Sequence, residues 1–124
     1  MNPVRSKDAP EPIGPYSQAI VAKDFVFVSG MIAIDPATGK VVAGGIKEQT
    51  TRALASLKAV LKAAGTSEKN VVKTTVFLRD GSLFKDMNEV YAAFFGDHKP
   101  ARSTVVTGFP RDDVLVEIEA VATK

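Results

Sequence analysis

The chain has 124 residues, of which 45% are apolar and 24% charged, and its formal net charge is +2. This length suits one domain with a hydrophobic core, and the small, scattered excess of basic residues argues against a nucleic-acid-binding surface. The absence of cysteine, the single histidine and the lack of any membrane-length apolar run indicate a cytoplasmic protein without disulfide, metal, cofactor or membrane partner.

The first 15 residues are polar and contain four prolines, which predicts an extended N-terminal arm without helix or strand. Two β-rich runs follow at residues 17–22 and 25–30, separated only by Lys23 and Asp24. Short β-rich runs around a two-residue polar turn predict a β-hairpin.

Two amphipathic helices are predicted further along the chain. Over residues 46–64, apolar side chains recur at three- and four-residue spacing, and Gly65 lies where a terminating glycine belongs. A second helical stripe covers residues 84–95, with Ser82 as the candidate N-cap and Gly96 as the stop.

Three further strands complete the predicted elements. β-branched residues indicate a strand at residues 70–78, and two more strands close the chain at residues 102–107 and 114–123. The resulting order β-β-α-β-α-β-β predicts an α+β fold, in which a mixed sheet carries both helices on one face.

The predicted strands carry apolar residues on both faces. Within residues 70–78, side chains alternate between the two faces of the strand. One face holds Val72, Val76 and Leu78, and the other holds Val71 and Phe77. Residues 25–28 are apolar throughout. Because two helices cover only one face of a sheet, the other face needs a second cover, most simply another copy of the chain. We therefore expect a homo-oligomer.

Three charged residues interrupt the two closing strands. Glu117 and Glu119 share a strand face with Leu115 and Val121. These glutamates either solubilise an exposed face or belong to a site, and the pattern leaves both interpretations open. Arg102 opens the preceding strand, where its guanidinium can reach water, pair with Glu117 or Glu119, or bind an anion from outside the chain.

The remaining polar and aromatic candidates have ordinary structural interpretations. His98 is interpreted as a loop histidine, because nothing near it in the sequence resembles a nucleophile or a metal ligand. Tyr16 and Tyr91 are interpreted as packing residues, and Tyr91 fits the second helical stripe. Ser29 and Gly30 end a predicted strand, where they are compatible with a simple turn.

Five segments taken together resemble the RidA/YjgF family of imine deaminases. In chain order they are IGPYSQA, VSGMI, VVKTTVFL, PARSTV and VEIEAVA, and they make residues 1–124 a single RidA-like domain. The resemblance implies a chorismate-mutase-like fold and a homotrimer with clefts between subunits. The implied reaction hydrolyses 2-imino acids, such as 2-iminobutanoate and 2-iminopropanoate, to 2-keto acids and ammonia, without a cofactor.

The resemblance also implies roles for individual residues. Arg102 would bind the substrate carboxylate, and Glu117 would hold or activate the attacking water. The remaining implied contacts are Tyr16, Ser29 and Gly30 along the cleft, Asn88 at its rim and the backbone amide of Thr104 on the carboxylate. Two positions depart from common family members: Met31 replaces a frequent Gln, which leaves the polarity of the cleft wall open, and Thr104 replaces a frequent Cys.

The chemistry of these residues agrees with the implied reaction. A planar guanidinium matches a carboxylate in a bidentate manner, and water delivery to an electrophilic carbon needs only one carboxylate base. Two alternatives remain: a non-catalytic carboxylate-binding or regulatory protein of the same fold, and an RNA-acting translation inhibitor or ribonuclease. The scattered basic charge argues against the RNA-acting alternative.

Overall fold

The computed structural model describes residues 1–124, which fold as one six-stranded sheet with two α-helices. The strands lie in the order β1-β2-β3-β6-β4-β5. Only β4 and β5 are parallel; the other neighbouring strands are antiparallel. The strand bounds are β1 Asn2–Val4, β2 Ala19–Ala22, β3 Phe25–Met31, β4 Val71–Leu78, β5 Ala101–Val106 and β6 Val116–Thr123.

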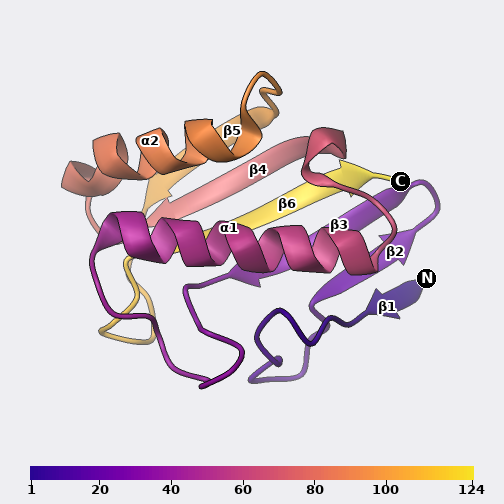
Figure 1. The fold of residues 1–124 in the computed structure, drawn as a ribbon, viewed down its shortest axis with the longest axis horizontal. Coiled ribbons are helices and arrows are strands. Elements are labelled where there is room, and N and C mark those ends of the chain that lie inside the picture. The colour runs from indigo at the N-terminus through magenta and orange to yellow at the C-terminus, as the bar shows by residue number, and fades with distance from the viewer.

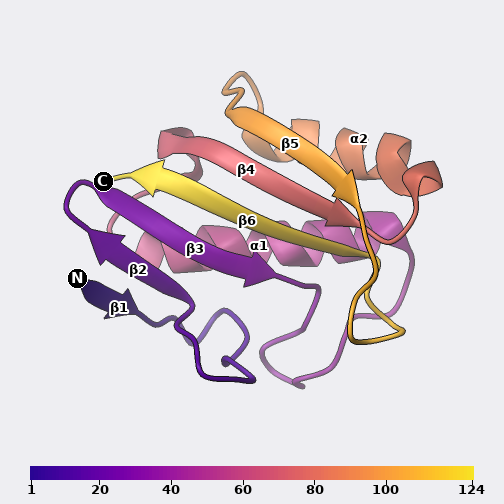
Figure 2. The same cartoon turned by 180° about the vertical axis from the view of Figure 1, so that it is seen from behind.

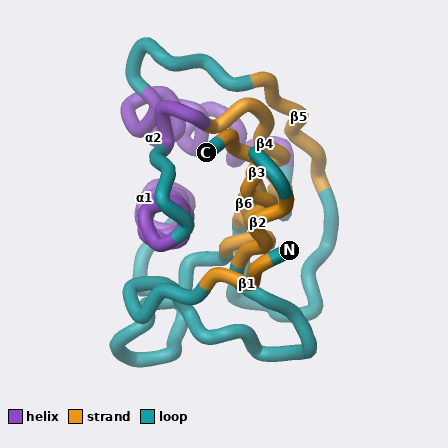
Figure 3. The backbone as a smooth tube through the Cα atoms, turned by 90° about the vertical axis from the view of Figure 1, so that its right-hand side faces the viewer, coloured by secondary structure: helices purple, strands orange, loops and turns teal.

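Both helices, α1 (Ile46–Ala63) and α2 (Phe84–Phe95), lie on the same face of the sheet (Figure 1). The view from behind shows the other face without a covering element (Figure 2), and the edge-on view separates the two layers (Figure 3). The predicted α+β fold is therefore confirmed, as is the order of elements from β2 to β6. No helix is long and apolar enough to cross a membrane.

The core lies between α1, α2 and the sheet. Helix α1 buries its apolar stripe, including Leu54, Leu57 and Leu61, against β3 and β6. The side chain of Glu48 accepts a hydrogen bond from the Gly45 backbone N–H at 2.8 Å, which fixes the start of this helix. Each of these buried leucines is worth about 2–5 kcal/mol of stability by comparison with alanine.

Two predictions at element ends are wrong. The arm does contain a strand, because Asn2–Val4 pairs with β2 at the edge of the sheet, where the missing N–H of Pro3 is tolerated. Ser82 is not the N-cap of α2. Instead, the Asp80 side chain accepts a hydrogen bond from the Ser82 N–H at 2.8 Å, and a 3₁₀ turn (Gly81–Leu83) leads into the helix.

The predicted faces of β4 are correct at its end but wrong at its start. Val76 and Leu78 are buried as predicted, but Val71 is also fully buried, whereas Val72 is exposed. The register against β6 shifts between Val71 and Lys73, so a bulge at this point reverses the alternation. A one-residue insertion of this kind leaves no trace in the sequence pattern.

The uncovered face of the sheet is apolar in several places. Phe25 and Phe27 of β3 lie next to each other along this face and are 44% and 48% exposed, while Val26 and Val28 point into the core. Val105 of β5 is also exposed. The expectation of apolar residues on both faces of β3 is therefore confirmed, and this bare face is a candidate surface for contact with another chain.

Candidate functional site

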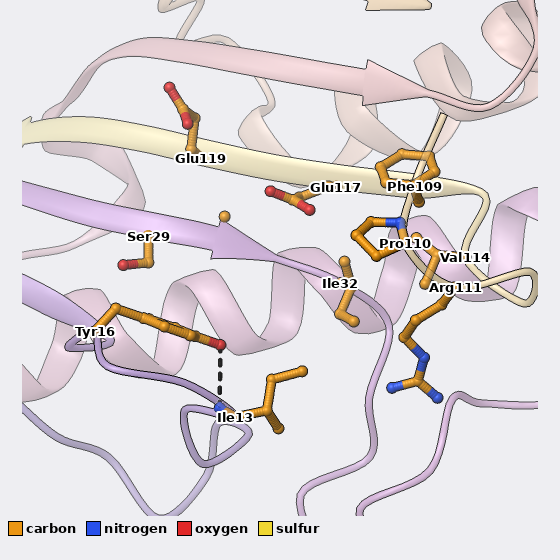
Figure 4. A pocket seen from close by; sticks show the side chains of 11 residues that line it. Ile13, Tyr16, Ser29, Ile32, Phe109, Pro110, Arg111, Val114, Glu117 and Glu119 are labelled. Carbon is orange, nitrogen blue, oxygen red and sulfur yellow. Dashed lines mark hydrogen bonds between the residues drawn. The ribbon is translucent and has the colours of Figure 1, made fainter. Parts of the chain in front are cut away.

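The largest group of predicted site residues lines a pocket of about 520 Å³ on the uncovered face of the sheet (Figure 4). We call it the Glu117 pocket. Strands β3 and β6 form its floor, and the N-terminal arm and the loop between β5 and β6 form its walls. Its lining residues are Ile13, Tyr16, Ser29, Gly30, Ile32, Phe109, Pro110, Arg111, Val114, Glu117 and Glu119.

Glu117 reaches the pocket because β6 alternates strictly. Val116 and Ile118 are fully buried on the helix side, so Glu117 and Glu119 point to the uncovered face. Gly30 makes room for the carboxylate: a Cβ at this position would lie 2.7 Å from Glu117 Cδ and still closer to Oε2. The glycine therefore fixes how closely the Glu117 carboxylate approaches the β3 backbone.

The surroundings of Glu117 favour its protonated form more than water does. Burial is the main cause that raises the pKa of its carboxyl group, and the neighbouring charge of Glu119 raises it further. A carboxylate whose pKa is raised is a stronger base when it is ionised, which suits proton transfer from a water molecule.

The wall formed by the N-terminal arm contains Tyr16. Its hydroxyl accepts a hydrogen bond from the Ile13 N–H at 3.3 Å, which closes a short turn of the arm above the pocket (Figure 4). The hydroxyl of Ser29, on β3, donates to the Ser17 carbonyl at 2.6 Å. Tyr16 is 48% exposed, so it lines the pocket and does not belong to the core.

Two side chains from distant elements hold the opposite wall. Arg79, just after β4, donates from Nε to the Val114 carbonyl at 2.6 Å and from Nη2 to the Arg111 carbonyl. Its guanidinium also lies over the Phe109 ring, 5.3 Å from the ring centroid. On α1, Gln49 Nε2 donates to the Asp113 carbonyl at 2.8 Å, and its Oε1 accepts from the Leu115 N–H at 2.9 Å.

Arg102 lies in a different place, on the helix-covered side of edge strand β5. Its Nη1 donates to Asn88 Oδ1 of α2 at 2.7 Å, and its guanidinium carbon lies 4.7 Å from the centroid of the Tyr91 ring and 5.5 Å from that of Phe84. These contacts fix the direction of the guanidinium. We call the surrounding depression of about 420 Å³ the Arg102 groove; it is lined by Asn88, Tyr91, Ala92, Phe95, Gly96, His98, Lys99, Pro100 and Arg102.

The Arg102 guanidinium has no carboxylate of its own chain within ion-pair distance. The alternative in which Arg102 pairs with Glu117 or Glu119 is therefore wrong, because the sheet separates Arg102 from these two glutamates. Tyr91 does more than pack in the core. Its hydroxyl lies 2.6 Å from Thr74 Oγ1, in a buried hydrogen bond that orients the ring beneath the guanidinium.

Thr104 and Met31 contribute differently from the pocket residues. Thr104 lies two residues after Arg102 on β5, and its hydroxyl is buried without a hydrogen-bond partner. Met31 is 5% exposed and points into the core beside Ile118. The polarity of the Glu117 pocket therefore does not depend on Met31, which lines only a smaller neighbouring cavity.

Within one chain, the predicted site residues other than Thr104 thus fall into two groups. Tyr16, Ser29, Gly30 and Glu117 meet in the Glu117 pocket, while Asn88 and Arg102 meet in the Arg102 groove. The sequence analysis missed the supporting residues. Gln49 carried a signal, as a polar residue on the buried stripe of a helix, whereas Arg79 and Thr74 carried none.

No group of three or more His, Cys, Asp or Glu side chains is placed to hold a metal ion. The single histidine, His98, lies in the loop before β5, and its Nε2 is 2.6 Å from the Val71 carbonyl oxygen. Chemically, the site offers an oriented guanidinium for a planar anion and a half-buried carboxylate for proton transfer.

A family model described as Endoribonuclease L-PSP matches residues 6–124. The chain is 54% identical over 119 residues to a RutC family protein of Pyrococcus horikoshii. The alignment covers 96% of this chain and 94% of that protein. It is 42% identical over 120 residues to the chloroplastic Reactive Intermediate Deaminase A of Arabidopsis thaliana. That alignment covers 97% of this chain and 64% of the Arabidopsis protein.

Solved structures agree with these relatives. A Thermotoga maritima protein superposes with a TM-score of 0.96 at 51% identity and covers 100% of this chain and 98% of its own. E. coli TdcF with bound serine superposes with a TM-score of 0.94 at 38% identity and covers 100% and 99%. These matches confirm the predicted chorismate-mutase-like fold.

Proposed function

The chain belongs to the Endoribonuclease L-PSP family, also called the RidA/YjgF family, and we propose that it hydrolyses reactive 2-imino acids to 2-keto acids and ammonia. Expected substrates are 2-iminobutanoate and 2-iminopropanoate. One observation carries the proposal: Arg102 is held in position by Asn88 and Tyr91 but has no anion of its own chain to bind. A 2-imino acid supplies that anion as its carboxylate.

Two relatives support this substrate class. The Arabidopsis relative is named a reactive intermediate deaminase, and the TdcF structure holds serine, a small molecule with a 2-amino carboxylate. Serine differs from a 2-imino acid at the carbon that would be attacked, but both present the same carboxylate to a guanidinium.

In the proposed mechanism, Arg102 binds the carboxylate and directs C2 of the protonated imine toward Glu117. The ionised Glu117 takes a proton from water as the water oxygen attacks C2, and the C=N π electrons move to nitrogen. The resulting carbinolamine has an O–H and an amine on C2. Protonated Glu117 then returns its proton to the amine. As the C2–N bond breaks and ammonia leaves, Glu117 takes the hydroxyl proton and the C2–O bond becomes the carbonyl. One water is consumed for each keto acid formed, and the extra proton of the protonated imine leaves Glu117 with ammonia as ammonium.

This mechanism requires two copies of the chain at each site. The Glu117 pocket opens on the uncovered face and Arg102 lies on the helix-covered side, so one chain does not bring both to one substrate. We propose a homotrimer in which Arg102 of one subunit faces the Glu117 pocket of its neighbour. The exposed Phe25, Phe27 and Val105 on the uncovered face support such a contact, because a second chain would remove them from water.

A coupled assay tests the proposed activity. A threonine dehydratase generates 2-iminobutanoate, and semicarbazide traps the imine that escapes hydrolysis. Addition of the protein should raise the rate of 2-ketobutanoate release and lower the yield of trapped imine. Unchanged rates at micromolar protein, with a well-folded sample, would contradict the deaminase proposal.

Ligand-binding and RNA-cleavage measurements beside this assay separate the two alternatives. A non-catalytic carboxylate-binding protein would bind 2-ketobutanoate without accelerating imine hydrolysis. A ribonuclease, the activity in the family description, would cleave RNA and lose RNA binding steeply as salt rises. Of the two alternatives, we rank the ribonuclease below the carboxylate-binding protein. The single histidine is hydrogen-bonded to the Val71 carbonyl and does not line the Glu117 pocket.

A further inference from the structure

Gln18 is a buried polar residue that the proposed mechanism does not use. It precedes β2, is 2% exposed, and lies between the sheet and the N-terminal arm. Its Oε1 accepts a hydrogen bond from the Ser6 N–H at 2.6 Å. Its Nε2 donates to the carbonyls of Ser6 at 3.1 Å, Ala9 at 3.4 Å and Pro10 at 2.8 Å.

These bonds satisfy backbone groups of a segment that belongs to no regular element. The arm between β1 and β2 contains three prolines and forms neither helix nor strand over residues 5–18. Buried backbone carbonyls without a donor are costly, so the arm needs a partner inside the fold. A single side-chain amide supplies both a donor and an acceptor group, which neither a carboxylate nor an apolar side chain of similar size does.

The segment that Gln18 holds leads directly into the Glu117 pocket. Ala9, 2% exposed, anchors the arm in the core, and Arg52 of α1 donates to the Asp8 carbonyl at 3.3 Å. The chain then turns through Ile13 and Tyr16, which line the pocket beside Glu117. On the other side of Gln18, its carbonyl accepts the Ser29 N–H at 2.9 Å, which ties it to the pocket floor.

We propose that Gln18 is a positioning residue: it closes the N-terminal arm over the Glu117 pocket and thereby places the wall formed by Ile13 and Tyr16. The inference rests on the proposed function for its catalytic consequence, but its structural part stands without it. Gln18 does not line the Glu117 pocket, and all hydrogen bonds of its side chain go to the arm, so the side chain acts through the arm.

An open arm would change the environment of Glu117. The charged or titratable groups around this carboxylate are Glu119 on its own strand, Tyr16 from the arm and Arg111 from the β5–β6 loop; Phe77, opposite on β4, carries no charge. Burial is the main cause that raises the pKa of Glu117, and Ile13 and Tyr16 of the arm line the pocket that this carboxylate faces. With the arm open, water reaches the carboxylate and its pKa falls toward the ordinary value.

The test replaces Gln18 in the full chain. Gln18→Met keeps the approximate volume but removes the donor and acceptor, and Gln18→Glu keeps the shape but removes the amide donors. The matched control is Arg5→Ala, which removes an exposed ion pair with Glu11 within the same arm. Three quantities are measured for each: hydrogen exchange of residues 1–17, the pKa of the Glu117 carboxyl by carbon NMR titration, and imine hydrolysis.

We expect both Gln18 variants to speed amide exchange in the arm by roughly 10–100-fold, because several backbone groups lose their partner. Exchange in α1 should stay unchanged. In Gln18→Met, the pKa of Glu117 should fall, so the acid limb of the rate profile should move to lower pH while kcat/KM decreases. Arg5→Ala should resemble the wild-type protein in all three measurements.

Two results would overturn the inference. One is arm exchange that stays at the wild-type level in both variants. The other is a general loss of protection with an unchanged Glu117 pKa, which is the mark of a purely structural residue. If the arm opens and the pKa falls but even the wild-type protein does not hydrolyse imines, the positioning role stands and the proposed function fails.

Discussion

The Glu117 pocket and the Arg102 groove are built in different ways. Arg102 is held by side chains of regular elements, Asn88 and Tyr91 on α2, whose own positions follow from helix packing. Glu117 lies on a regular strand, but its pocket walls are an arm and a loop without regular structure. The Arg102 groove, which binds the anion in the proposed mechanism, is therefore held by side chains of regular elements, whereas the walls of the Glu117 pocket depend on long-range hydrogen bonds to backbone.

The two regions also treat charge in opposite ways. The Arg102 guanidinium keeps favourable partners, an amide oxygen and two aromatic faces, and so remains an oriented cation. Glu117 lies half-buried beside a like charge, which raises its pKa. In the proposed mechanism this difference divides the labour: Arg102 binds the substrate carboxylate, whose charge stays constant, and Glu117 gains and loses a proton during the reaction.

Glu117→Gln should have the largest effect on turnover. The amide is nearly isosteric but does not accept a proton from water, so kcat should fall by about 10²–10⁴-fold while 2-ketobutanoate binding persists. Steady-state kinetics and ketoacid titration measure the two quantities. Loss of ketoacid binding with unchanged kcat would reverse the roles given to the two regions.

The same variant should not destabilise the protein. Because the pKa of Glu117 is raised in the folded state, the folded protein binds more protons than the unfolded chain between the ordinary pKa of Glu and this raised value. Stability therefore falls as pH rises through that window, and a neutral glutamine removes the loss. Thermal melts at neutral pH should show an equal or higher Tm for Glu117→Gln.

Arg102→Ala should have the largest effect on binding. It removes a charge-assisted bidentate contact, which costs roughly 2–5 kcal/mol when the partner charge is left unpaired, so ketoacid affinity should collapse. Arg102→Lys should restore little, because an ammonium lacks the planar fork. Isothermal titration with 2-ketobutanoate measures the loss. Wild-type affinity in Arg102→Ala would contradict the proposal that Arg102 binds the substrate carboxylate.

Gly30→Ala tests how closely Glu117 must approach β3. The new Cβ would overlap the carboxylate, so the Glu117 side chain must move away. We expect kcat to fall about 10-fold with little change in ketoacid affinity, since a misplaced base loses alignment but Arg102 is untouched. Kinetics beside a thermal melt check this; a kcat at the wild-type level would show that the close packing has no catalytic role.

Thr74→Val should have the smallest effect and acts on the other region. It leaves the Tyr91 hydroxyl buried without its partner, which costs about 1–3 kcal/mol of stability and loosens the ring beneath Arg102. Ketoacid affinity should weaken a few-fold, with kcat preserved. Adding Tyr91→Phe removes the unpaired hydroxyl and should recover part of both losses; a double variant worse than the single one would contradict this role for the hydrogen bond.

The sequence predicts the regular half of this molecule better than the irregular half. Helix and strand periodicity places Glu117 on the uncovered face and identifies the stripes of α1 and α2. Periodicity cannot reveal Gln18 or Arg79, because each satisfies backbone groups that lie 8–12 or 32–35 residues away along the chain, respectively. The contact of Tyr91 with Arg102 is hidden for another reason: a residue within the buried stripe of a helix can also support a site.

The central claim is that Arg102 of one subunit and Glu117 of its neighbour act on the same substrate molecule. Its most direct test mixes the two inactive variants, Arg102→Ala and Glu117→Gln, under conditions where subunits exchange, with mass spectrometry of tagged chains to verify mixed assemblies. Random mixing leaves about a quarter of the sites with both residues intact. We predict that imine hydrolysis returns to about that fraction of the wild-type rate; mixed assemblies that stay inactive would contradict the shared site.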